Sequence, residues 1–598
     1  MMYHNEKRHI YINLIFAVAF SLGYVFLLLR LLPVTFFSND QLVMRDLVSG
    51  VYTGKNDGHL IYIMYILGSA LAGLYRIGPS VPWYDLCMGL TYPVAFFFFS
   101  YRISENVKKI WAKCISLAAF TIAFFVVNMY GYVMNEYTLD AAVWAALGVF
   151  FLVTARGMTR GEKIFEDTVI AASLLLCLWL RRQVFYMSMP FVVLIGLYRW
   201  FYGKTDKKSI VVGKQKIATL WNDNFLRPVI FLLLGAVVSL AVEKAAYSSP
   251  EWKDYLSFNR ARTDIFDYAG EPPYEDYKSL YDNLGVSEAE VASMWYGLAL
   301  IKSFDTETLQ SIATVSKTLN NGKVLADKSA FLYLVKRELA EAKKQPIGMI
   351  VCVVALSTIL YIVLSNWKES KTGIVRSLFP VLSGAYVLAF ATLFIYLGRY
   401  PYRVSQGMYF IALAVILGGL LLEKDAYFVS KEKGYAGLFL GIFTCLILAF
   451  CSIKAYSANK LLVDETVDTW SKYNDEQNIL QEYCKQHPEN IYSFHISVSN
   501  YQNHVFYQKT GETAPNGITL NYWVTKSPVF EERLNNIGIS NLSSTFERAD
   551  NVFYVSRPDR DNTWLSNLCS DYGATIRMSE VERIESSNGE LVIYQIVH

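Results

Sequence analysis

The chain has 598 residues, of which 53% are hydrophobic, and its formal net charge is only +3 at pH 7. Apolar runs of membrane-spanning length exclude a single soluble domain, and the small net charge gives no support for a nucleic-acid partner. The eight cysteines show no CxxC pair and no zinc-ligand spacing, so no structural metal site is predicted. We therefore expect a polytopic, all-α membrane protein.

The loop charges select eleven membrane spans from twelve apolar segments. If all twelve segments span, the basic loops 102–113 and 203–224 fall outside, against the positive-inside rule. If residues 59–77 form an interfacial or re-entrant outer helix instead, every short basic loop becomes cytoplasmic; a buried spanning helix is the alternative for that segment. The predicted spans are 10–32, 83–101, 112–130, 139–155, 167–181, 186–202, 225–246, 346–364, 376–396, 406–422 and 434–453.

This topology predicts a cytoplasmic N-terminus, with the first apolar run as a retained anchor and not a cleaved signal peptide, and four parts in chain order. In the middle insertion, aromatic and polar residues at three- and four-residue steps predict helices, with Pro272-Pro273 as a breaker. The last part is expected to be a small extracytoplasmic α/β domain with a helix at 464–486 and strands at 491–498, 552–555 and 591–597. The parts are residues 1–246 with a first outer loop at 33–82, the outer insertion 247–345, the spans of 346–453, and the domain 454–598.

Acidic residues stand at both ends of the polar stretch 33–57, which opens the first outer loop, and at the mouth of a later span. Asp40 begins the loop, Asp57-Gly58-His59-Leu60 introduces the outer helix, and Asp140 ends the second outer loop. With the topology, this pattern resembles the GT-C superfamily of membrane glycosyltransferases, which includes protein O-mannosyltransferases and aminoarabinose lipid A transferases. The resemblance implies that Asp40 is the family's first-loop acid, and that Asp57 and His59 correspond to its Asp-x-His motif, here without the Pro-Pro that follows it.

Asp40 is the predicted catalytic residue. Transfer of a sugar from a lipid phosphate to a hydroxyl group needs a base for the acceptor proton, and a carboxylate at the aqueous edge of a membrane suits that role. Alternatively, Asn39 or Asp40 caps a helix over Gln41–Val48. Glu136 and Asp140, one helical turn apart, suit a hydrogen-bonding pair for the sugar, ligands for a divalent cation such as Mg²⁺ or Mn²⁺, or a solvated loop with an N-cap.

Arginines on the outer face are candidate partners for the donor phosphate, because the guanidinium fork matches phosphate oxygens. Arg399 and Arg403 share a short outer loop where positive charge opposes the topology rule, although snorkelling to lipid headgroups is the alternative. Arg30, Arg181 and Arg182 are further candidates. The insertion adds an aromatic and polar cluster suited to sugar rings or to a plain helical core: Trp252, Tyr255, Phe258, Asn259, Arg260, Arg262, Asp267, Tyr268 and Tyr274. Cys484 and Cys569 either pair or remain buried thiols.

The leading functional prediction is an integral membrane glycosyltransferase that takes a sugar from a polyprenyl-phosphate donor. The acceptor would be a cell-surface glycan, a glycolipid or a protein outside the cytoplasm. Three alternatives stay open: a transporter or flippase for a lipid-linked glycan, a glycan polymerase or ligase, and a non-catalytic protein that binds surface glycans.

Overall fold

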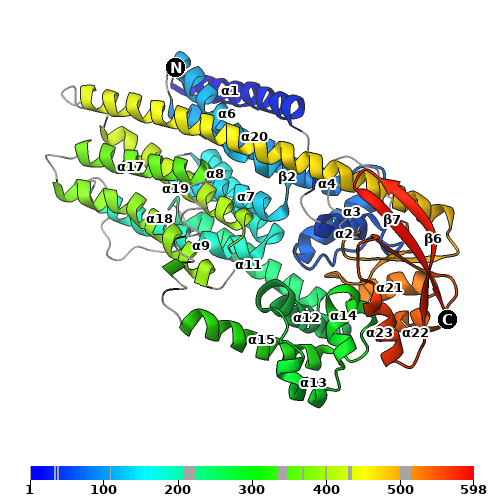
Figure 1. Ribbon diagram of the computed structural model, residues 1–598. Coiled ribbons are helices and arrows are strands. Elements are labelled where there is room, and N and C mark those ends of the chain that lie inside the picture. Colours follow the sequence, from blue (N-terminus) through cyan, green and yellow to red (C-terminus); the bar gives the residue numbers. More distant parts are fainter. Residues whose placement is uncertain are drawn as a thin grey trace.

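The protein is a helical bundle with an α/β domain at one end. The computed structural model describes residues 2–598 except for 33–34, 37–38, 108, 158, 206–222, 327–328, 330–331, 334–335, 337–345, 366–369, 397–399, 428–433 and 499–513. Long helices lie side by side, and the C-terminal strands and a group of shorter helices gather at one end of them (Figure 1). The predicted class, a polytopic all-α membrane protein with a small α/β domain, is confirmed.

Seven helices in the described part of the chain are long and apolar enough to cross a membrane. They lie in α1 (Met2–Leu31), α4 with α5 (Trp83–Gly89 and Thr91–Asn106), α6 (Ile110–Val133), α7 (Tyr137–Thr154), α11 (Leu226–Ala246), α18 (Ser370–Tyr396) and α19 (Tyr402–Tyr427). The other four predicted spans also fall on helices, namely α8 (Arg160–Leu180), α9 (Arg182–Thr205), α17 (Pro346–Ser365) and the first part of α20 (Gly434–Gln486).

The bundle is built around α7. Its span is almost entirely buried, against α19, α8 and α9, whereas α1 and α11 lie at the periphery and are mostly exposed. Most exposed side chains of α11 are apolar, including Leu233, Leu234 and Val237. A helix with such a face is suited to contact lipid tails, which need no polar partners.

The first outer loop forms two short helices at the end of the bundle. α2 (Asn39–Ser49) carries Asp40 in its first turn, and α3 (Tyr65–Ile77) follows an irregular stretch. The sequence places the start of the outer helix at residue 59, but the helix begins at Tyr65, and its 13 residues extend about 20 Å, too short for a membrane of about 30 Å. Gly68 of α3 packs directly on the backbone of Gly58, where neither residue leaves room for a Cβ atom.

A short parallel pairing ties the two outer loops together. β1 (Thr35–Phe36) pairs with β2 (Met134–Asn135), immediately before α2 and α7 respectively. The pairing brings the beginnings of these two helices to one place.

The insertion is helical, as its periodicity predicts. It consists of α12 (Pro250–Thr263), η1 (Asp264–Ala269), η2 (Glu275–Tyr277), α13 (Lys278–Leu284), α14 (Glu288–Gly297), η3 (Leu298–Leu300) and α15 (Thr306–Ala326). Pro272-Pro273 lies in the break after η1, and Ser249 caps α12 through the amide of Trp252. Trp252, Tyr255 and Phe258 are buried, so this part of the aromatic cluster serves the core.

The last span and the C-terminal helix are one continuous helix, α20, which passes along the bundle and into the α/β domain (Figure 1). The sequence predicts a separate helix at 464–486 and a boundary at residue 454, but this boundary falls inside α20. No glycine or proline stands between Gly441 and Pro488 to interrupt the helix, which ends at Gln486.

The C-terminal sheet has the strand order β4-β3-β5-β7-β6. β3 (Ile491–Phe494), β5 (Val552–Ser556) and β7 (Gly589–Val597) correspond to the predicted strands, whereas β4 (Gly517–Thr519) and β6 (Arg577–Ser586) are additional. β4 has only three residues and β6 is a mostly exposed, charged edge strand, so neither has the apolar alternation of a strand. The domain also contains α21 (Pro528–Asn536), α22 (Leu542–Arg548) and α23 (Thr563–Asp571), and its Cys484 and Cys569 are buried free thiols.

Candidate active site

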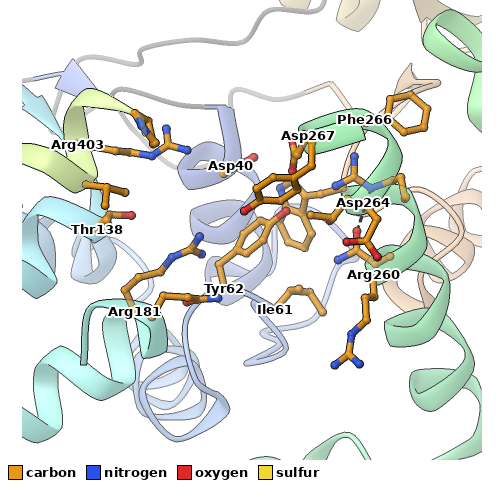
Figure 2. Close-up of a pocket in the computed structure, with 18 of the residues that line it drawn as sticks. Asp40, Ile61, Tyr62, Thr138, Arg181, Arg260, Asp264, Phe266, Asp267 and Arg403 are labelled. Carbon is orange, nitrogen blue, oxygen red and sulfur yellow. Dashed lines mark hydrogen bonds between the residues drawn. The ribbon is translucent and has the colours of Figure 1, made fainter. Parts of the chain in front are cut away.

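A cavity of about 680 Å³ lies where the outer loops, the insertion and the C-terminal domain meet the bundle. Asp40 and Tyr62 come from the first outer loop, Thr138 from the start of α7, and Arg181 from the junction of α8 and α9. Figure 2 shows Arg181 and Arg403 on one side of this space and Asp264 and Arg260, from the insertion, on the other, with Asp40 between them. The cavity is thus formed by segments that are far apart in the sequence, from the first outer loop to the C-terminal domain.

Asp40 lies in the first turn of α2, and one of its carboxylate oxygens, Oδ1, accepts a hydrogen bond of 3.0 Å from the hydroxyl of Tyr522. Burial raises the pKa of Asp40, while the Tyr522 hydrogen bond and the charges of Arg403, Arg181 and Arg262 act in the opposite direction. The net pKa is above the usual value for an aspartate. A carboxylate whose pKa is raised in this way is suited to accept a proton.

Three arginines place positive charge around Asp40. Arg181 donates to the hydroxyl of Tyr137 at 3.4 Å, and its guanidinium lies 5.3 Å from the Tyr62 ring and 5.2 Å from the Tyr137 ring. Such stacking holds a planar cation in place with its charge intact.

Arg262 and Arg403 complete this positive wall. The Nε of Arg262 donates to the side-chain oxygen of Asn259 at 2.9 Å, and the guanidinium of Arg403 lies 3.9 Å from a carboxylate oxygen of Glu136. Arg260, Arg262 and Arg403, all three predicted from the sequence, line the cavity. Arg399 lies outside the described residues, and Arg30 is an exposed residue at the end of α1.

Asp57 and His59 do not line the cavity. The Nδ1 of His59 lies 2.6 Å from a carboxylate oxygen of Asp57, and its ring stacks on Trp252 at 4.6 Å between centroids. Burial acts to raise the pKa of Asp57, but the hydrogen bonds and charge of His59 outweigh it and the pKa is lowered. The pair therefore joins the first outer loop to the insertion, behind the cavity wall.

Glu136 and Asp140 also lie behind the cavity. Glu136 is the N-cap of α7 and accepts hydrogen bonds from the amide and hydroxyl of Thr138 at 3.0 and 2.8 Å. Asp140 is fully buried, and neither of its carboxylate oxygens has a hydrogen-bond partner among the described residues. The described residues contain no cluster of three or more histidine, cysteine or acidic side chains that could hold a metal ion.

A second cavity of about 460 Å³ shares a wall with the first, formed by Ile61, Tyr62, Arg181, Gln183, Leu256 and Arg260. Its other lining residues include Lys244, Lys253 and Arg182, whose guanidinium pairs with Glu243 at 2.9 Å. Leu240, on the exposed apolar side of α11, also lines it. This second cavity is strongly basic and lies next to the exposed apolar face of α11.

Residues 519–523 contribute to the site although no sequence pattern predicts them there. Thr519, Asn521, Tyr522 and Trp523 line the first cavity, although nothing in their spacing indicates a site. The one local signal is the Asn-Tyr-Trp run, a combination of aromatic and amide groups in an outer domain. Their position is set by the folding of the C-terminal domain against the insertion.

Comparison with known proteins gives two similar solved structures. No protein-family model matches the chain, and no curated protein matches it. Crystal structures of ArnT from Cupriavidus metallidurans in the apo state and bound to undecaprenyl phosphate align with it at TM-scores of 0.38 and 0.37. In both, the sequence identity is 12% and the alignment covers 97% of each chain.

Proposed function

We propose that the protein is an integral membrane glycosyltransferase that transfers a sugar from a polyprenyl-phosphate donor to a hydroxyl group on the outer face of the membrane. The observation that carries this proposal is one partly buried carboxylate, Asp40, surrounded by Arg181, Arg262 and Arg403 in a cavity of suitable size. A carboxylate can accept the acceptor's proton, and the arginines can neutralise the phosphate that leaves.

The chemistry assigns each group one task. The acceptor oxygen forms a bond to the anomeric carbon of the sugar while its proton moves to Asp40. The bond between that carbon and the phosphate oxygen breaks, and its electron pair stays on the phosphate. Fixed guanidinium groups facing the leaving phosphate stabilise the charge that develops there, which is the largest electrostatic contribution expected at such a site.

The second cavity supplies the route for the donor. Leu240 connects it to the exposed apolar face of α11, while Lys244, Lys253 and Arg182 make its lining basic. A lipid phosphate that moves along α11 would meet these cations first and reach Arg181 and Arg260, which line both cavities. Its sugar would then extend into the first cavity, toward Asp40.

The proposed sugar transfer is metal-independent, because arginines surround the carboxylate. Asp40 faces Arg181, Arg262 and Arg403, whose charges oppose a cation bound at this carboxylate. The Glu136 carboxylate, for which a divalent-cation ligand was one of the alternatives open from the sequence, caps α7. Activity that persists in EDTA would agree with this arrangement.

The proposal is tested by comparing cells that carry the native chain with cells that carry Asp40→Asn at matched membrane abundance. We expect the variant to lose one surface sugar modification and to accumulate the corresponding lipid-linked sugar. Asp254→Asn is the control, because Asp254 is an exposed acid of α12 that does not line the cavity.

Other outcomes identify other functions. A lipid-linked sugar that accumulates only in the cytoplasmic leaflet would indicate a flippase. An unchanged glycan profile would refute the role of Asp40 and favour a protein that recognises surface glycans.

A further inference from the structure

Tyr522 reaches Asp40 from the far end of the chain, 482 residues away in sequence. It lies on the segment 520–527, here called the strap, which connects β4 to α21 in the C-terminal domain. The strap places the Tyr522 hydroxyl 3.0 Å from Oδ1 of Asp40. A residue of the C-terminal domain therefore touches the carboxylate that we place at the centre of the reaction.

The strap is held on both sides of Tyr522 by the insertion. Before it, the carbonyl of Leu520 accepts from the amide of Ala299 at 2.8 Å, and the Asn521 side chain donates to the carbonyl of Trp295 at 2.6 Å. After it, the carbonyl of Trp523 accepts from the hydroxyl of Tyr255. These contacts fix the backbone from which Tyr522 projects.

Lys526 anchors the other end of the strap. Its ammonium group donates to the carbonyls of Ile301 and Phe304 at 2.9 and 2.7 Å, and burial lowers its pKa to about 8. Its backbone has φ of 62°, a conformation that a side chain other than glycine rarely adopts. Such a backbone persists only where the surrounding contacts enforce it. The strap is therefore a rigid support.

We propose that Tyr522 is a positioning residue for Asp40, which holds the carboxylate through Oδ1 and leaves Oδ2 to take the acceptor's proton. The inference rests on the proposed function and extends it, because it makes the C-terminal domain an essential part of the active site. A hydrogen bond from a neutral hydroxyl to a carboxylate stabilises the ionised form, which is the form that a base requires.

The hydrogen bond matters because burial works against the ionised form. Burial raises the pKa of Asp40, and the Tyr522 hydrogen bond is the first of the interactions that lower it again. If the hydroxyl is removed, burial is opposed only by the remaining charges, and the pKa rises further. The titratable and charged groups that act on Asp40 include Tyr62, Tyr137, Arg181, Arg262, Arg403 and Tyr522.

The test uses Tyr522→Phe in the full chain, which removes one oxygen atom and keeps the ring. The protonation of Asp40 is followed by infrared spectroscopy of the carboxyl C=O stretch against pH, with Asp40→Asn identifying the band. We expect the pH at which half of Asp40 is protonated, the titration midpoint, to be higher in Tyr522→Phe than in the native chain. An unchanged midpoint would overturn the inference, whatever reaction the protein catalyses.

Tyr572→Phe is the matched control. The Tyr572 hydroxyl also joins the C-terminal domain to the insertion, because it donates to Glu290 at 2.7 Å and accepts from the amide of Lys302 at 2.9 Å, but it does not line the cavity. Tyr572→Phe should leave the midpoint of Asp40 in place. A shift of equal size in both variants would show that only the seating of the domain matters, and would also overturn the inference.

A second measurement follows the transfer of label from lipid-linked sugars in membranes that contain the native chain or the variant. The Tyr522→Phe variant should transfer about tenfold more slowly at neutral pH, as expected for loss of one hydrogen bond to a charged group. On the acidic side of the pH–rate profile, the fall in the transfer rate should shift to higher pH by the same amount as the infrared titration midpoint. If Asp40→Asn transfers at the native rate, the proposed function fails, while the infrared shift still decides whether Tyr522 positions Asp40.

Discussion

Replacement of Arg181 tests the assignment of the leaving-group site. Its guanidinium lies within 6 Å of two ring centroids and beside the Tyr137 hydroxyl, so it is oriented before any ligand arrives. One hydrogen bond to a charged group is worth about 1.5–3 kcal/mol, or roughly 10- to 150-fold in rate if it is made in the transition state. Arg181→Gln removes the charge and should lose this full amount. Arg181→Lys keeps the charge but loses the planar fork, and should lose about tenfold.

The assay measures the rate at which label leaves the lipid-linked sugar pool in membranes with matched amounts of each variant. Arg30→Gln is the control, because Arg30 is exposed at the end of α1 and does not line either cavity. The order of rates should be native and control, then Arg181→Lys, then Arg181→Gln. A native rate for Arg181→Gln would refute the assignment. Equal losses in both Arg181 variants would indicate that the stacked geometry matters and the charge does not.

Two further predictions concern the support around the site. Gly68→Ala should lower the melting temperature clearly, because a Cβ atom at residue 68 meets the backbone of the preceding loop. Gly73→Ala, on the same helix, is the control: a Cβ atom there meets nothing within 4 Å, so this variant should be neutral or slightly stabilising. Equal melting temperatures of the two variants would show that α3 does not pack as described. The second prediction is that the C-terminal domain is sensitive to acid. Burial of His495, and after it the charges of nearby arginines, lower the pKa of His495 from 6.5 to about 4. A lowered pKa stabilises the folded form above pH 6.5, and this contribution, roughly 3 kcal/mol, is lost as the pH falls toward 4. His495→Gln should flatten denaturation midpoints measured between pH 7 and 4, and an unchanged slope would contradict the prediction.

Much of the site follows from simple sequence rules. An acid at the start of an outer loop is costly unless it has a function, which predicts Asp40, and a positive charge in an outer loop opposes the positive-inside rule, which predicts Arg403. Both line the cavity. The spacing of one helical turn between Glu136 and Asp140 predicts a pair for the sugar or a cation, or an N-cap, and Glu136 lies behind the wall as a helix cap. Local sequence cannot distinguish a capping acid from one that faces a ligand, because both precede or begin a helix.

The sequence by itself determined the membrane class, the eleven helical segments and the helical insertion, because apolar run length and periodicity are local properties of the chain. Only the tertiary structure decided that Tyr522 meets Asp40 across 482 residues, since this contact depends on how the strap is anchored to the insertion. It also decided that Asp57 and His59 support the wall and do not line the cavity. Burial and long-range neighbours set the role of each charged group, and neither is encoded in the spacing of residues along the chain.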